Sequence, residues 1–332
     1  MINFKKSCLK PLIINFFLLA ILLELFLRAF KSIYYDGILW IHTPSVNNVY
    51  DKKLGWKSPK SRTFFKKDEI YGNGQITYNS QGFRAPEYID KNKWDFIVFV
   101  IGDSTMQGYQ IPDGQLFSHL LEKELKKYTN KPYILPLAVG GYGTIQQYLL
   151  VKEISDKIKP DLVIHHWSGN DIANNSYEIE RYTPTANNNR LKPYYEDNEI
   201  VYKSPYFFKL SPRIDSLMLM KFINNYSKNF FLKKLTNKDI KELEEKAWET
   251  TDLFIGKISN LFEKEVPKIA LIDDYQVSDM YKKHGFTTVY SSVPTNLTGL
   301  PRDNHATGAG HSYMIKSIMP EIEKKLEFIK EN

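Results

Sequence analysis

From position 94 onward, short apolar runs alternate with longer amphipathic runs, and this alternation constrains the fold more than any other feature of the sequence. The first apolar run, 96–101, reads FIVFVI, which is typical of a strand covered on both faces. Parallel strands need connections of a dozen or more residues, so the pattern predicts an α/β fold, a three-layer parallel sheet with helices on both sides. Four more strands are expected, at 133–139, 161–167, 268–272 and 287–290, and helices at 116–128, 143–159, 238–264 and 308 to about 328.

A single large domain is expected over residues 91–330, with an insertion at 174–237 that is rich in Asn and Tyr and breaks the strand–helix rhythm. We expect this insertion to form one wall of a ligand cleft. Before the domain, residues 32–90 contain the basic run DKKLGWKSPKSRTFFKK and are expected to be a linker and irregular segment. A solvated, lysine-rich surface explains the basic run more simply than attraction to anionic lipid head groups does.

Residues 11–30 are expected to form a transmembrane anchor. Residues 11–27 read PLIINFFLLAILLELFL, and at about 1.5 Å per residue the stretch 11–30 spans roughly 30 Å, the thickness of a hydrocarbon core. Lys5, Lys6 and Lys10 precede it, so the positive-inside rule predicts that residues 1–10 are cytoplasmic and that the domain lies on the extracytoplasmic side. A cleaved signal peptide needs a small-x-small site, for which LRAFKSIYY is poor, and a buried soluble helix would keep one polar face.

Charge and cysteine content argue against several classes of site. The chain has 45 Lys+Arg against 38 Asp+Glu, a formal charge of +7, but no arginine-rich run accompanies it, so no nucleic-acid partner is expected. Cys8 is the only cysteine, which excludes an intramolecular disulfide and a cysteine-based zinc site. His165 and His166 are neighbours in an expected strand and would point to opposite faces, which favours packing over metal binding. We expect neither a metal nor a cofactor.

Polar residues and glycines follow three of the expected strands and precede the last helix. Ser104 follows the first strand, Gly141 the second and Asn170 the third, while Asp303 and His305 lie in the loop before the final helix. Ligands of open parallel sheets gather at the carboxyl ends of the strands, so these residues are expected at one edge.

This set of residue types suits nucleophilic acyl transfer. A serine hydroxyl becomes a good nucleophile when an imidazole takes its proton, and the imidazole needs an acceptor that fixes its tautomer. Asp303 and His305 are two residues apart, so in an extended loop both side chains lie on the same side. The backbone N–H groups of Ser104 and Gly141 and the amide of Asn170 are candidate donors to an oxyanion.

The four blocks Gly102-Asp-Ser104, Gly141-Tyr-Gly-Thr144, Gly169-Asn-Asp171 and Asp303-x-His305 resemble, in order and placement, those of the SGNH (GDSL-type) hydrolases. The resemblance covers about residues 94–328. It implies a flavodoxin-like sheet, Ser104 as nucleophile, His305 as base, Asp303 as its partner, and an oxyanion hole from Ser104, Gly141 and Asn170. The late block is one residue shorter than the family's frequent Asp-x-x-His.

Residues 79–84, NSQGFR, are similar to a stretch seen ahead of the serine block in membrane-anchored members of that family, but no chemistry is assigned to them. The sequence thus predicts a membrane-anchored serine esterase that acts on a small acyl ester or an acylated glycan. Two alternatives stay open: an O-acyltransferase acting on an envelope polysaccharide, and a non-catalytic envelope binding protein.

Overall fold

The structure is a computed structural model that describes residues 6–29, 48–88, 93–182, 191–204 and 237–331, with a few single positions between 217 and 227. Its centre is a sheet of five parallel strands. In chain order these are β5 (Phe96–Gly102), β6 (Pro132–Ala138), β7 (Leu162–His166), β10 (Lys268–Ile272) and β11 (Thr287–Tyr290). Their spatial order, β11-β10-β7-β5-β6, is the flavodoxin-like order, which confirms the expected fold class.

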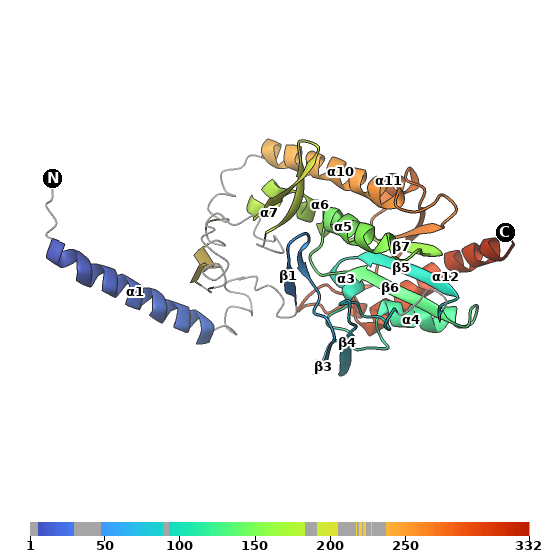
Figure 1. Ribbon diagram of the computed structural model, residues 1–332, viewed down its shortest axis with the longest axis horizontal. Helices are drawn as coiled ribbons and strands as arrows, with labels where there is room; N and C mark the ends of the chain where they lie inside the picture. The colour runs from blue at the N-terminus through green and yellow to red at the C-terminus, as the bar shows by residue number, and fades with distance from the viewer. Residues whose placement is uncertain are drawn as a thin grey trace.

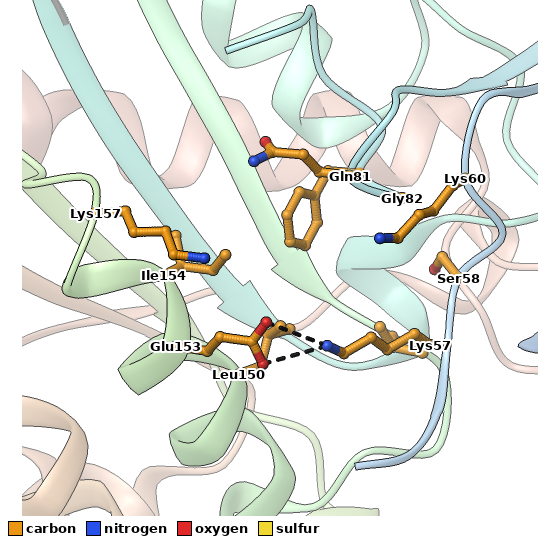
Figure 2. Close-up of a pocket in the computed structure, with 11 residues that line it drawn as sticks. Lys57, Ser58, Lys60, Gln81, Gly82, Leu150, Glu153, Ile154 and Lys157 are labelled. Carbon is orange, nitrogen blue, oxygen red and sulfur yellow. Dashed lines mark hydrogen bonds and ion pairs between the residues drawn. The ribbon is translucent and has the colours of Figure 1, made fainter. Parts of the chain in front are cut away.

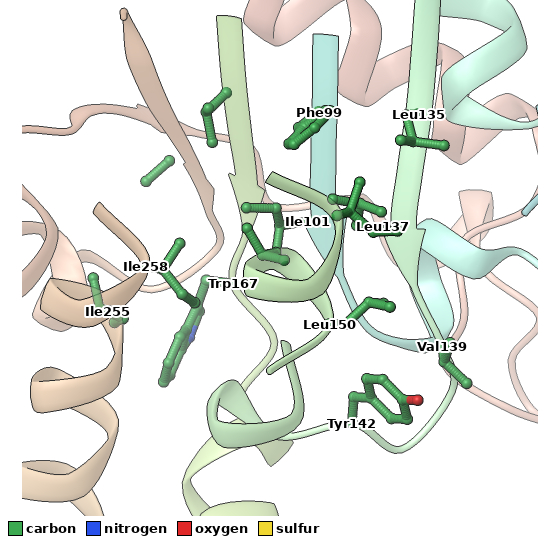
Figure 3. Packing of buried hydrophobic residues seen from close by; sticks show 14 of the residues in the cluster. Phe99, Ile101, Leu135, Leu137, Val139, Tyr142, Leu150, Trp167, Ile255 and Ile258 are labelled. Carbon is green, nitrogen blue, oxygen red and sulfur yellow. The ribbon is translucent and has the colours of Figure 1, made fainter. Parts of the chain in front are cut away.

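Helices cover both faces of this sheet, giving three layers (Figure 1). One face carries α5 (Thr144–Ser155), α10 (Asn237–Ser259) and the short α11 (Ser278–Lys282), and the other carries α4 (Phe117–Leu125) and α12 (Gly308–Glu331). Alternate residues of β5 enter different cores: Phe99 belongs to the core that contains Leu135 and Trp167 (Figure 3), whereas Val98 belongs to the core formed with residues of α4 and α12. Burial on both faces is the reason why the strand is apolar throughout.

The chain changes direction across the sheet at a point that positions the site. After β5 it adds β6 on one side and then crosses to add β7 on the other side of β5. The crevice at such a switch point, outside the carboxyl ends of the strands, is where open α/β sheets bind ligands. Ser104 begins α3 (Ser104–Gln107) just after β5, and Asn170 begins α6 (Asn170–Asn175) just after β7. Both residues therefore lie at this switch point.

The expectation of an irregular segment over 32–90 is wrong for its described part, 48–88. There the chain forms two antiparallel hairpins, β1 (Val49–Asp51) with β2 (Gly55–Lys57), and β3 (Arg62–Lys66) with β4 (Gly74–Tyr78). The lysine-rich composition of this segment did not predict the hairpins, several of whose aromatic and apolar residues are buried. The fully or almost fully buried residues are Leu54, Trp56, Tyr71, Ile76 and Tyr78.

The described part of the expected insertion 174–237 contains α7 (Tyr177–Tyr182) and a hairpin of β8 (Lys192–Glu196) with β9 (Glu199–Lys203). A fully buried ion pair at 2.7 Å, Lys192 with Glu180, joins α7 to this hairpin. Residues 183–190 and most of 205–236 lie outside the described residues, so the predicted cleft wall stays a prediction.

The N-terminal helix α1 (Lys6–Ala29) contains a segment, Lys10–Ala29, that is long and apolar enough to cross a membrane. Its mean hydropathy is 2.3 and 6% of it is buried. A signal sequence would meet the same criteria of length and hydropathy. Residues 30–47, where the anchor was predicted to end, lie outside the described residues.

Candidate active site

Asp103 organises the part of the site that the sheet provides. It is 1% exposed and caps α3, with its Oδ1 accepting from the Thr105 backbone N–H at 3.2 Å and from the Ser168 hydroxyl at 2.9 Å. Its Oδ2 accepts from the Asn170 amide at 3.2 Å and lies 3.3 Å from Ser104 Oγ. One buried carboxylate thereby ties the loops after β5 and β7 together.

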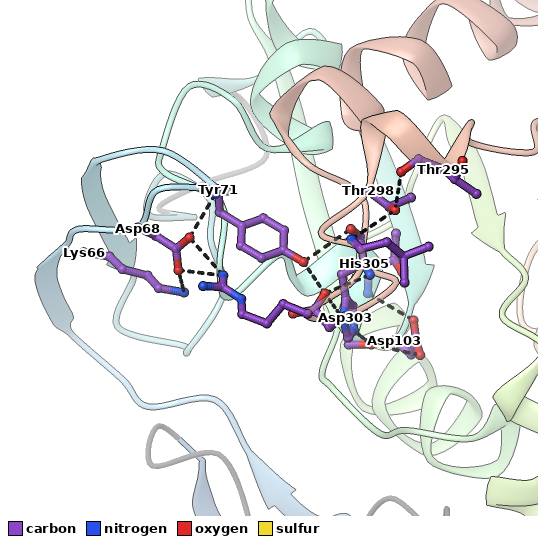
Figure 4. A network of polar contacts seen from close by, with 12 residues as sticks. Lys66, Asp68, Tyr71, Asp103, Thr295, Thr298, Asp303 and His305 are labelled. Atoms are coloured by element: carbon purple, nitrogen blue, oxygen red, sulfur yellow. Dashed lines mark hydrogen bonds and ion pairs between the residues drawn. The ribbon is translucent and has the colours of Figure 1, made fainter. Parts of the chain in front are cut away.

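Ser104, His305 and Asp303 lie within hydrogen-bond distance of one another in series. His305 Nε2 is 2.8 Å from Ser104 Oγ, and His305 Nδ1 is 3.2 Å from Asp303 Oδ1 (Figure 4). Asp303 Oδ1 also accepts from the His305 backbone N–H at 3.0 Å. With the short Asp-x-His spacing, one carboxylate oxygen therefore contacts both the ring and the backbone of His305. With Nδ1 donating to Asp303, Nε2 is free to accept the serine proton.

Tyr71 is a member of the site that the sequence analysis missed. It lies in the loop between β3 and β4, and its hydroxyl donates to Asp303 Oδ1. Gly299 leaves room for it, because a Cβ at 299 would lie 2.1 Å from the Tyr71 hydroxyl oxygen. Tyr71 and Asp303 are 232 positions apart, and no local pattern of residues joins them.

The hydrogen bonds to Asp303 set its charge. Burial by itself would raise the pKa of this carboxyl, but hydrogen bonds from the His305 ring, the Tyr71 hydroxyl and the His305 backbone outweigh burial and lower the pKa to about 2. Asp303 is therefore ionised throughout the neutral range. An ionised carboxylate at this position stabilises an imidazolium on His305.

A second carboxylate, Asp68, joins the loop of Tyr71 to the loop of Asp303. Both Asp68 oxygens lie 2.9 Å from Arg302 Nη2, and Asp68 Oδ1 also accepts from the Tyr71 backbone N–H at 3.0 Å. The Arg302 guanidinium in turn lies 5.3 Å from the centre of the Tyr71 ring. These contacts hold the β3–β4 hairpin against the loop that carries the histidine (Figure 4).

Tyr109, in the loop after α3, packs edge-on against His305 with ring centres 6.2 Å apart. Burial and the nearby Asp303 charge raise the pKa of Tyr109 to about 12, so its hydroxyl stays neutral at physiological pH. This ring covers one side of the imidazole, and the sequence contained no signal for it.

The loop after β6 lies against Ser104. A Cβ at Gly140 would lie 3.5 Å from the Ser104 Cβ, and Gly141 has a φ of +76°, which a glycine adopts without strain. Gly140 is held at both ends of its backbone: its N–H donates to Gln107 Oε1 at 2.9 Å, and its carbonyl accepts from Trp56 Nε1 at 3.0 Å. Within the described residues, the N–H groups of Ser104 and Gly141 donate to no acceptor.

The segment NSQGFR (79–84) has a structural role at this site. Arg84 is 2% exposed and donates to the carbonyls of Gly108 and, at 2.7 Å, Ile111, with an ion pair to Asp113 at 2.6 Å. Gly108 ends α3 in the left-handed conformation. Asn79 shapes the turn before Arg84, because its Oδ1 accepts from the Phe83 backbone N–H at 2.9 Å. The segment therefore fixes the chain that follows the helix of Ser104.

No group of three or more His, Cys, Asp or Glu side chains in the described part of the chain could hold a metal ion. His165 points into the core, with Nε2 2.7 Å from Gln147 Oε1 and Nδ1 3.3 Å from the Tyr281 hydroxyl. His166 lies on the other side of the strand, with Nδ1 3.4 Å from Ser168 Oγ. The two rings have different partners, as their neighbouring positions in one strand require.

No family model matches the chain, and no curated protein matches it. Solved structures similar to it include TesA (10% identity, TM-score 0.41, covering 69% of this chain and 99% of that chain). A lipolytic protein of the G-D-S-L family from Veillonella parvula has 9% identity and a TM-score of 0.38, covering 68% of this chain and 96% of that one. A variant of Axe2, an acetylxylan esterase from Geobacillus stearothermophilus, has 11% identity and a TM-score of 0.38, covering 69% and 94%.

Proposed function

We propose that this protein is a serine esterase of the SGNH (GDSL) type, which cleaves an O-acyl ester through an acyl-serine intermediate. The observation that carries the proposal is the series of contacts from Ser104 Oγ to His305 Nε2 at 2.8 Å and from His305 Nδ1 to Asp303 at 3.2 Å. The four sequence blocks that resemble the SGNH hydrolases support it, because three of them follow β5, β6 and β7 and the fourth supplies Asp303 and His305.

In the first step, His305 Nε2 takes the hydroxyl proton while Ser104 Oγ attacks the acyl carbon, and the ionised Asp303 stabilises the imidazolium. The C–O bond to the alcohol then breaks, and the imidazolium gives its proton to the leaving alkoxide. In the second step, His305 takes a proton from water, which attacks the acyl-serine. Collapse of this second intermediate returns the proton to Ser104 Oγ and releases the acid. Each step uses groups of this chain and water.

The tetrahedral intermediates carry a negative oxygen that needs donors. The N–H groups of Ser104 and Gly141 have no acceptor among the described residues, and Gly140, the neighbour of Gly141, lies against Ser104. One amide hydrogen of Asn170 goes to Asp103, which leaves its second hydrogen for the oxyanion. In our proposal these three groups form the oxyanion hole, and each donor of this type typically contributes about 3 to 4 kcal/mol to the transition state.

In this proposal the substrate is a small acyl ester or an O-acylated glycan, and α1 anchors the enzyme in a membrane with its N-terminus in the cytoplasm. The length and hydropathy of Lys10–Ala29 support the anchor, and the lysines ahead of the apolar run support the orientation. The acetylated xylan on which Axe2 acts is an example of an O-acylated glycan.

Labelling with a fluorophosphonate tests the proposal directly, because this reagent phosphonylates an activated serine. The full-length protein in detergent is expected to become labelled, and Ser104→Ala is expected to remain unlabelled. A folded parent that resists labelling would overturn the proposal in favour of the non-catalytic binding protein. Products formed from an acetyl ester, with and without an acceptor glycan, separate hydrolysis from acyl transfer: free acetate in both cases supports the esterase, and acetylated glycan contradicts it.

A further inference from the structure

A cavity of about 140 Å³ lies apart from Ser104 and His305, between the chain that follows β2, the turn after β4, and α5. We call it the basic cavity. Three lysines line it, Lys57, Lys60 and Lys157, and Figure 2 shows Lys57 and Lys60 approaching from one wall and Lys157 from the other. The remaining lining residues are Ser58, Gln81, Gly82, Phe83, Val139, Leu150, Glu153 and Ile154.

The charge around the basic cavity is unbalanced. Lys57 is paired with Glu153 at 3.3 Å and with Asp51 at 3.3 Å. Lys60 and Lys157, by contrast, form no ion pair with any carboxylate that the structure describes. Three ammonium groups against the carboxylates of Glu153 and Asp51 leave a net charge of +1, and the two lysines without an ion pair, Lys60 and Lys157, carry the positive excess. A concave site with an excess of one sign of charge raises the local concentration of ions of the opposite sign.

The floor of the basic cavity is apolar. Phe83, Leu150 and Ile154 are buried there, and the polar Ser58 and Gln81 lie at its side. An apolar cavity of about 150 Å³ in another protein holds a molecule of the size of benzene, so this one has room for about six heavy atoms. An apolar floor below cationic side chains fits a ligand that has both an apolar body and an anionic group.

We propose that the basic cavity binds a small organic anion, whose carboxylate or phosphate group contacts Lys60 and Lys157 and whose short apolar body rests on Phe83, Leu150 and Ile154. The site is joined to the loop beside Ser104 by two hydrogen bonds. Ser58 Oγ, in the lining, accepts from Gln107 Nε2 at 2.8 Å, and Gln107 Oε1 accepts from the Gly140 N–H at 2.9 Å. A ligand in this cavity therefore lies next to Ser58, which is hydrogen-bonded to the Gln107 side chain that holds the Gly140 N–H.

The binding test uses full-length Ser104→Ala protein in detergent, so that its outcome is independent of the chemistry proposed for Ser104. Benzoate is expected to bind saturably by calorimetry, and uncharged benzamide at least about tenfold more weakly, because it lacks the charge that the lysines attract. Lys60→Gln/Lys157→Gln is expected to weaken benzoate binding by about tenfold or more. The matched control, Lys123→Gln/Lys316→Gln, makes the same change of charge at two exposed lysines of α4 and α12 and is expected to bind benzoate like the parent.

Lysine acetylation read by mass spectrometry locates the bound anion. Benzoate is expected to protect Lys60 and Lys157 and to leave Lys123 as reactive as before. Parallel titrations with inorganic phosphate and phenyl phosphate distinguish the anionic groups. Tighter binding of phenyl phosphate than of inorganic phosphate supports the apolar floor, and equal binding overturns it. Absence of saturable benzoate binding, or equal losses in both double variants, would overturn the proposal.

Discussion

The serine side and the histidine side of the candidate site are built in different ways. Asp103, which positions Ser104 and Asn170, is 1% exposed and lies between the ends of two buried strands. The side chains of Asp303 and His305 are 30% and 25% exposed, and they lie on a loop held by hydrogen bonds from the β3–β4 hairpin. The serine side is therefore part of the folding core, whereas the histidine side is held against it from outside.

This difference indicates which property each substitution should change. On the serine side, a lost hydrogen bond leaves buried donors without a partner, so stability and activity should fall together. On the histidine side, water can replace a lost partner, so activity should fall while stability changes little. The following predictions run from the largest expected effect to the smallest.

His305→Ala should lower kcat/KM for ester hydrolysis by about 10⁴- to 10⁶-fold, because the serine loses its general base. Its free energy of unfolding should stay within about 0.5 kcal/mol of the parent, since the ring is partly exposed. Steady-state hydrolysis and urea unfolding measure the two quantities. The double variant Ser104→Ala/His305→Ala should be no slower than either single variant; additive losses would mean that the two residues do not act as a unit.

Asp303→Asn should lower kcat by about 10⁴-fold or less, because an amide can hold His305 in the wrong tautomer and provides no charge to the imidazolium. The fold should again be unaffected. A pH–rate profile of the variant checks the mechanism. If the variant were as active as the parent at neutral pH, Asp303 would not be the catalytic partner of His305.

Asn170→Ala should lower kcat by about 10²- to 10³-fold with little change in KM, as expected for an oxyanion donor. Because the same amide donates to Asp103, the variant should also lose about 1 kcal/mol of stability. Kinetics and urea unfolding of one preparation test both parts. A rise in KM at unchanged kcat would instead indicate that Asn170 only binds the substrate.

Asp103→Asn should lower the free energy of unfolding by about 2 kcal/mol, because an amide cannot accept all the hydrogen bonds that the carboxylate accepts from Ser168, Thr105 and Asn170. Asp303→Asn is the matched control, and it should cost less than about 1 kcal/mol. If the two variants are equally destabilised, the contrast between the two sides of the site is wrong.

Tyr71→Phe should have the smallest effect, about tenfold in kcat or less, because it removes one of several hydrogen bonds to the Asp303 carboxylate and leaves those from His305 in place. The pKa of Asp303 is depressed to about 2, so its ionised form adds stability above its ordinary pKa near 4, and this stability is lost as the pH falls towards 2. Without the Tyr71 hydroxyl the pKa should rise towards its ordinary value. The melting temperatures of parent and variant should therefore differ at pH 5 and converge near pH 2; a difference that persists at pH 2 would contradict this.

Local pattern determined much of the fold. The strands at 96–102, 132–138, 162–166 and 268–272 lie where the apolar runs predicted them, because burial on both faces of a parallel sheet requires mostly apolar residues. The strand at 287–290 also lies at its predicted position, but it is a partly exposed strand at the edge of the sheet. The polar blocks that follow these strands could also be predicted to lie together, because the carboxyl ends of parallel strands meet at one edge of the sheet. Ser104, Asn170 and His305 could therefore be named from the sequence as candidates.

The tertiary structure alone decided how these candidates are held. Tyr71, Trp56 and Arg84 come from a segment whose lysines suggested an irregular linker, yet they contact Asp303, the Gly140 carbonyl and the chain after α3. Their partners are remote in sequence, and a side-chain hydrogen bond between distant residues leaves no periodic signal. The sequence by itself determined the sheet and the types of catalytic side chain at its edge. The packing of the two hairpins on the domain decided how those side chains are held, because packing depends on which buried surfaces fit one another.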